Sequence, residues 1–137
     1  MKKFVIIKLI GLSILVMASL IFVSFIEVAI YSYLINPGQD VSIYDAHALK
    51  SAPYISGLFG LILFFFIARF WVRKNYSNIA LLIWLFPIIY LTIDFLIFLL
   101  AQVDFSEFMG VFLLTNTFKF LGSYAGYKFN KIVSENK

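Results

Sequence analysis

The chain has no cysteine and only one histidine, and these two absences remove several classes of site. Without cysteine there can be no disulfide, thiolate metal site or cysteine nucleophile. His47 lacks a second histidine as a metal-binding partner, so we expect no metal site and place His47 in a loop at the membrane interface. No local signature of a Ser-His-Asp triad is present either. We therefore expect no cofactor and no enzymatic activity.

Charged residues are scarce as well, at 13% of the chain against 63% hydrophobic residues. A soluble domain has about 25% charged residues. Crossing about 30 Å of hydrocarbon at 1.5 Å per residue takes roughly 20 apolar residues. Four stretches reach this length, at about residues 4–35, 51–72, 78–101 and 105–130. The sequence predicts an all-α integral membrane protein, with residues 1–137 forming one up-and-down bundle of four transmembrane helices.

The longest predicted loop covers residues 36–50. It begins with an Asn-Pro-Gly sequence at residues 36–38, which favours a tight turn because proline lacks an amide donor and glycine tolerates positive φ. The segment from Ser42 to Asp45 matches a capping box, which indicates a short helix lying at the interface. Ser51 is then the expected N-cap of the second transmembrane helix.

Basic residues are distributed very unevenly between the two predicted sides of the membrane. One side carries only Lys50, whereas the other carries Lys2, Lys3, Lys8, Arg69, Arg73, Lys74, Lys128, Lys131 and Lys137. The positive-inside rule places the second side, with both termini, in the cytoplasm. Topology thus explains the net charge of +4 without a nucleic-acid partner. We expect a multi-pass protein of the plasma or inner membrane, with the lipid bilayer as its partner. Whether it also binds a second copy of itself or another membrane protein is left open.

Three ionisable residues, Glu27, Asp94 and Lys119, lie inside the predicted spans and away from their ends. A charge at the bilayer centre costs about 2.5–3.5 kcal/mol even on the lenient insertion scale, so these side chains should face protein or water. Span midpoints and the lean of each Cβ toward the helix N-terminus predict that the three head groups meet at one depth. Neighbours at helical spacing extend this buried polar network: Tyr31, Tyr90 and Asn116.

Two functions fit such a network. In the first, the polar contacts only fix which helices touch, and the chain is a non-enzymatic accessory or structural membrane protein. In the second, Glu27, Asp94 and Lys119 form a proton or cation site of a small transporter or channel subunit. Two acids and one lysine leave one negative charge uncompensated, which a proton or another cation would neutralise. We favour the first function and keep the second as the alternative.

Small residues and one proline mark the expected helix contacts. Gly122 and Gly126 form a G-x-x-x-G step, which allows close helix packing within the monomer or in a dimer. A second stripe lies at a different depth, so we expect the two stripes not to pack together; it consists of Ala52, Ser56 and Gly60. Pro87 removes a backbone hydrogen bond to the carbonyl of Ile83 and is a candidate hinge.

Overall fold

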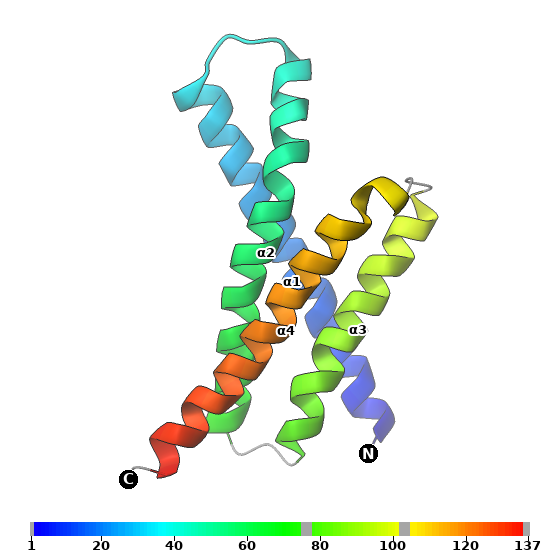
Figure 1. Ribbon diagram of the computed structural model, residues 1–137, viewed down its shortest axis with the longest axis vertical. Helices are drawn as coiled ribbons and strands as arrows, with labels where there is room; N and C mark the ends of the chain where they lie inside the picture. Colours follow the sequence, from blue (N-terminus) through cyan, green and yellow to red (C-terminus); the bar gives the residue numbers. More distant parts are fainter. Residues whose placement is uncertain (1, 75–77, 102–104, 136–137) are drawn as a thin grey trace.

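The computed structural model describes residues 2–74, 78–101 and 105–135, and within these ranges it contains helices and no strand. Helix α1 (Lys2–Ile30) continues into a π-helical turn, η1 (Tyr31–Ile35), and is followed by α2 (Val41–Arg73), α3 (Ile79–Leu100) and α4 (Phe105–Glu135). Successive helices alternate in direction, so α1 begins and α4 ends at the same end of the molecule (Figure 1). Three segments are long and apolar enough to span a membrane, Val5–Ile35, Val41–Arg73 and Ile79–Leu100. The predicted all-helical membrane class is confirmed at this level.

Helix α2 differs from its prediction, because it begins at Val41 rather than at Ser51. The turn is short and covers residues 36–40, with Gly38 at a φ of 77°. Asp40 is the residue at the N-cap, and it makes no capping hydrogen bond through its side chain. The predicted long loop with a separate interfacial helix is therefore wrong. The segment is instead the first part of α2, which packs against α1.

The hairpin of α1 and α2 is longer than the neighbouring α3. The 33 residues of α2 give it a length of about 50 Å, and the 22 residues of α3 give about 33 Å. The α1–α2 hairpin accordingly extends beyond the connected ends of α3 and α4 (Figure 1). The first part of α2 can thus contact only α1, and that contact carries one of the two polar clusters described below.

Helices α2 and α4 run in the same direction and form the most extensive helix interface. At Gly122 the place that a Cβ would occupy is taken by the backbone carbonyl of Leu61, and at Gly126 by that of Phe65. Further along the same interface, Gly60 lies against the aliphatic part of Lys119. The two small-residue stripes do lie at different depths. Gly60, Gly122 and Gly126 all lie in the α2–α4 interface, but each packs against residues outside the other stripe, so nothing contradicts the expectation that the two stripes do not pack together.

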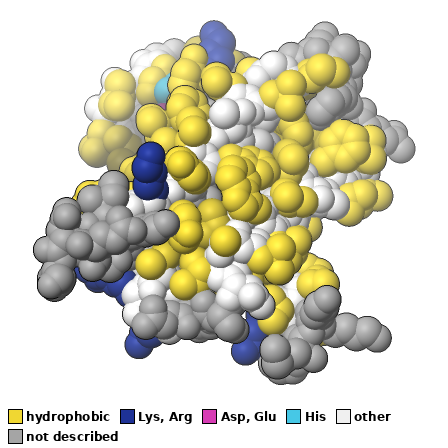
Figure 2. Space-filling view, turned by 60° about the horizontal axis from the view of Figure 1, so that its bottom comes forward, with side chains coloured by type: hydrophobic (Ala, Val, Ile, Leu, Met, Phe, Trp, Pro, Cys, Tyr) yellow, Lys and Arg dark blue, Asp and Glu magenta, His cyan; other side chains and the backbone are white. Residues whose placement is uncertain are grey.

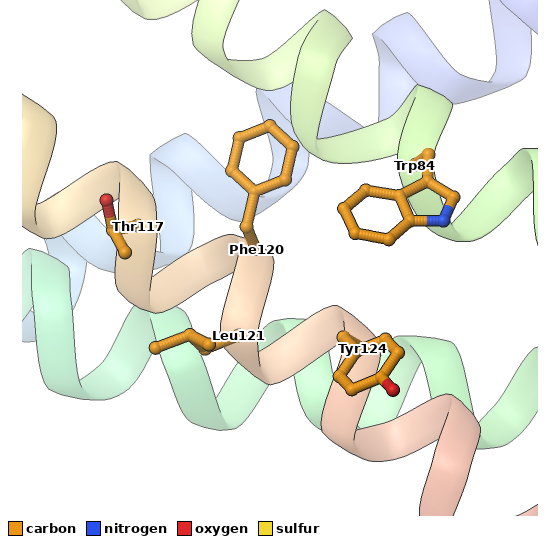
Figure 3. A pocket seen from close by; sticks show the side chains of 5 residues that line it. All are labelled: Trp84, Thr117, Phe120, Leu121 and Tyr124. Carbon is orange, nitrogen blue, oxygen red and sulfur yellow. The ribbon is translucent and has the colours of Figure 1, made fainter.

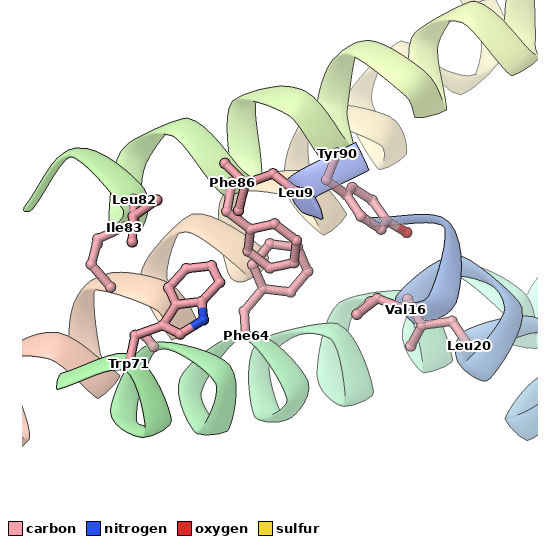
Figure 4. Close-up of a cluster of buried hydrophobic side chains, with 10 residues drawn as sticks. Leu9, Val16, Leu20, Phe64, Trp71, Leu82, Ile83, Phe86 and Tyr90 are labelled. Carbon is pink, nitrogen blue, oxygen red and sulfur yellow. The ribbon is translucent and has the colours of Figure 1, made fainter. Parts of the chain in front are cut away.

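An aromatic core joins α1, α2 and α3 near the end that carries the termini (Figure 4). Phe64 of α2 stacks on Phe86 of α3, with ring centroids 4.6 Å apart. Trp71 meets Phe86 edge-on, and Tyr90 meets Phe64 edge-on. Apolar side chains of α1 complete the cluster: Leu9, Val16 and Leu20. This core fixes the positions of α2 and α3, between which the second polar cluster is held.

Candidate functional site

The structure divides the predicted polar network into two clusters. Glu27 lies in the hairpin cluster, which consists of Glu27, Tyr31, Tyr44, His47 and Ser51. The central cluster consists of Ser56, Tyr90, Asp94, Asn116 and Lys119. On α2, Ser51 belongs to the hairpin cluster and Ser56 to the central cluster, and these two residues lie about 7.5 Å apart along the helix axis. The expectation that all three charged groups meet is therefore wrong for Glu27.

Glu27 uses both carboxylate oxygens within the α1–α2 hairpin. Its Oε1 lies 2.5 Å from Nε2 of His47, and its Oε2 accepts a hydrogen bond of 2.8 Å from the hydroxyl of Ser51. The histidine and glutamate side chains are 25% and 33% exposed, so the pair is only partly shielded from the surroundings. The contact is an ion pair when the imidazole is protonated and a hydrogen bond when Nε2 carries the proton of a neutral ring. In either state it closes the hairpin.

Two tyrosines fix the histidine and the turn. The ring of Tyr31 stacks flat on His47, with centroids 3.6 Å apart and an angle of 2° between the planes. Tyr44 donates a hydrogen bond to the carbonyl of Asn36 and accepts one from the amide of Gln39. Tyr31 is the first residue of the π-helical turn, and its carbonyl accepts a hydrogen bond of 2.8 Å from the backbone amide of Asn36, the residue that caps the turn. π-Helical turns often occur at functional sites, which makes the hairpin cluster a candidate site.

Lys119 is the centre of the second cluster, and its side chain is only 1% exposed. Its ammonium group donates a hydrogen bond of 3.1 Å to the hydroxyl of Ser56 on α2. The same group lies 4.7 Å from the centroid of the Tyr90 ring on α3, within the range of a cation–π interaction. One side chain of α4 thus contacts both neighbouring helices in the interior.

Asp94 lies beside Lys119 in the same cluster without forming a close ion pair. Its Oδ2 accepts a hydrogen bond of 3.2 Å from the side-chain amide of Asn116, which also donates to the carbonyl of Phe112. Within the described residues, no lysine or arginine nitrogen lies within 4.0 Å of this carboxylate. Asp94 is partly exposed, whereas Asn116 and Lys119 are buried. The amide therefore mediates the link between α3 and α4 at this level.

Ser123 was not among the residues singled out from the sequence, yet it makes a direct bond between helices. Its hydroxyl donates a hydrogen bond of 2.9 Å to the carbonyl of Ile83. This is the carbonyl that Pro87, four residues later, cannot bond because proline has no amide hydrogen. Pro87 is fully buried within a continuous α3, and its role as a hinge stays a prediction. A serine of α4 thus replaces the hydrogen bond that the proline removes.

The chemistry available to these clusters is hydrogen bonding and charge pairing. The described residues contain no group of three or more His, Asp or Glu side chains placed to hold a metal ion. In the hairpin cluster, both His47 and Ser51 are bonded to Glu27 and not to each other, so the serine is not activated by the histidine. Comparison with known proteins gives no matching family model, curated protein or solved structure.

Proposed function

We propose that this chain is a non-enzymatic membrane protein that acts as an accessory or structural component, with its polar residues fixing the arrangement of its helices. The contacts of Lys119 carry the proposal. Its ammonium group contacts the Ser56 hydroxyl on α2 and the Tyr90 ring on α3, so one side chain of α4 links it to both neighbouring helices. In membranes, where lipid is as apolar as leucine, such polar contacts help to specify which helices associate.

The same proposal includes a fourth spanning helix and cytoplasmic termini. The inward face of α4 carries the buried Lys119 and Ser123, while most of its outward positions are apolar, as expected for a helix surrounded by lipid. The exposed apolar residues include Phe108, Met109, Val111, Leu113, Leu114 and Leu121. Because α2 spans and α4 runs beside it in the same direction, α4 crosses the bilayer with it. The basic bias of one side then supports termini in the cytoplasm.

A small transporter or channel subunit is the alternative function. It is favoured by Asp94, a partly exposed carboxylate that accepts one hydrogen bond from the described residues, from the side-chain amide of Asn116. A carboxylate with a neutral partner can accept a proton or a small cation. The charge of Lys119, held in the same cluster, opposes entry of a second cation. We therefore favour the structural function.

A double-mutant cycle with Lys119→Met and Ser56→Ala tests the structural role. Membrane hydrogen bonds average about 0.6 kcal/mol, so we expect a coupling energy of this order in unfolding experiments in detergent. Methionine keeps the length of the side chain without its charge, and the single variants should fold. Zero coupling would mean that the contact does not help to hold α2 and α4 together.

Flux measurements separate the two functions. Wild-type protein in liposomes should pass neither protons nor potassium ions above the rate of empty liposomes under an imposed gradient. If flux is present and is lost in Asp94→Asn, with folding unchanged, the transport function replaces the structural one. Glu27→Gln provides the comparison, because Glu27 lies in the other cluster.

A further inference from the structure

A groove of about 640 Å³ lies between α1 and α2, near the end of the molecule that holds the termini. Its apolar wall includes Leu12 of α1 and Leu63, Phe66 and Ile67 of α2, and its lining also contains Arg69 and Arg73. Ligand sites in proteins measure about 300–1,000 Å³, and this groove falls in that range. Neither polar cluster contributes to it.

The groove has a cationic end and an apolar end. Arg73, in the last turn of α2, is exposed, and Arg69 lies one turn earlier. The guanidinium of Arg69 is positioned by the Phe129 ring of α4, whose centroid is 5.1 Å away. From Arg73 to Leu63 the groove follows α2 for about 15 Å, which is half of the 30 Å hydrocarbon thickness and hence one leaflet. Basic side chains border a largely apolar surface in the view toward this end (Figure 2).

We propose that this groove binds an anionic phospholipid of the leaflet next to the basic end of the bundle. Arginine forms paired hydrogen bonds with phosphate oxygens, so the exposed Arg73 suits the headgroup, and the positive charge of Arg69 one turn away adds to the attraction. The wall from Ile67 to Leu63 suits an acyl chain, and the two ends are one leaflet apart. Anionic lipids are drawn to basic residues at the membrane boundary. The site is independent of the proposed accessory function, because it needs only the groove and its charges.

A second pocket shows what the proposal depends on. It lies between α3 and α4, measures about 190 Å³ and is lined by Trp84, Thr117, Phe120, Leu121 and Tyr124 (Figure 3). It is smaller than the usual range of ligand sites, and none of its lining side chains is charged. Arginines at one end of an apolar groove thus distinguish the α1–α2 groove from a simple gap between aromatic side chains.

Native mass spectrometry of the full chain in detergent tests the proposal with defined lipids. We expect phosphatidylglycerol to be retained as one bound molecule at concentrations where phosphatidylcholine, with matching acyl chains, is not. Inorganic phosphate at millimolar concentration should not displace it, since the acyl chain contributes to binding. Equal retention of the two lipids would overturn the proposal, and so would displacement by free phosphate, which would mark a simple anion site.

Variants then locate the site. Arg73→Gln should weaken the binding of phosphatidylglycerol about five-fold, the share of one basic residue near a membrane surface. Lys128→Gln removes an equal charge at the same end from a residue outside the groove lining, and it should keep the wild-type affinity. Both positions are exposed, so both variants should fold. If the two variants lose affinity equally, the lipid is attracted by the basic end as a whole, and the groove is not its site.

Discussion

The bond between Ser123 and Ile83 leads to a prediction that depends on Pro87. Ser123→Ala leaves the Ile83 carbonyl without a donor, and Ser123 is only 1% exposed, so water does not replace the bond. An average membrane hydrogen bond contributes about 0.6 kcal/mol. Leaving a buried acceptor unsatisfied costs more, about 1–3 kcal/mol. We expect the free energy of unfolding to fall by an amount in this second range.

Pro87→Ala should remove most of that loss. Alanine restores an amide hydrogen four residues after Ile83, and the carbonyl then has a donor within its own helix. In the Pro87→Ala background, Ser123→Ala should therefore cost only about 0.6 kcal/mol or less. The coupling energy between the two positions, which is the difference between these two costs, should be about 0.4–2.4 kcal/mol. Any cavity left by the proline side chain cancels in the cycle, because it is present in both members of the pair.

The assay is equilibrium unfolding in mixed micelles, followed by circular dichroism, for the wild type and the three variants. Ser19→Ala is the matched control: its hydroxyl donates to the Leu15 carbonyl of its own helix, and we expect a change within about 0.5 kcal/mol. If Ser123→Ala costs the same in both backgrounds, Ser123 acts through packing alone. The idea that it replaces the missing proline bond is then refuted.

Three further predictions concern the helix contacts and the topology. Gly122→Ala should lower the free energy of unfolding in detergent by about 1–3 kcal/mol without changing the oligomeric state. Gly110→Ala is the control: nothing lies within 4 Å of its new Cβ, so its free energy of unfolding should stay unchanged, and equal stabilities of the two variants would contradict the prediction. Glu27→Ala should raise hydrogen exchange in residues 31–51 and leave α3 unchanged, and a uniform increase would show that the hairpin cluster is not local. An extracytoplasmic reporter should be silent after Lys137 and active near Gln39, and the reverse pattern would refute the charge argument.

Much of the helical architecture could be predicted from the sequence because bilayer thickness imposes a simple rule on length and composition. The segment Ile79–Leu100 agrees with the prediction of about 78–101. The start of α2 could not be found in this way, since residues 41–50 contain polar groups that fit a loop as well as a helix. In the structure, His47 of this segment contacts Glu27 and Tyr31 of α1, and a pattern read from one segment alone does not include these partners.

The partners of Glu27 could have been predicted from the symmetry of a hairpin. In an antiparallel pair, residues equally far from the turn lie opposite each other. Glu27 lies eleven residues before Gly38, while His47 and Ser51 lie nine and thirteen residues after it, one on each side of the opposite position. The depth argument missed this pairing because it assigned residues 36–50 to a loop. A wrong helix boundary thus became a wrong set of contacts.

The membrane depth inferred from each residue's position in its span correctly placed four residues together: Asp94, Asn116, Tyr90 and Lys119. All four lie within one turn of a common level on α3 and α4. Depth did not predict Ser56 as the acceptor of Lys119, since the choice among hydroxyl groups depends on which helix is the neighbour. Nor did it identify the role of Ser123, although the proline that leaves Ile83 unbonded was visible in the sequence. A missing donor in one helix indicates that a donor is needed, and only the packing of α4 shows which residue provides it.

Both polar clusters include residues of α2, and this has a consequence for how the bundle is held together. α2 contacts α1 through the hairpin cluster, α4 through Ser56 and the two glycines, and α3 through Phe64. In lipid, apolar contacts alone select partners weakly, because the lipid itself is an equally good apolar neighbour. The contacts that select a partner here are the hydroxyl groups of α2 and its close approach to glycines. The polar residues of α2 thus contact α1 and α4, whereas α3 makes its polar contacts with α4 through Asn116, Lys119 and Ser123.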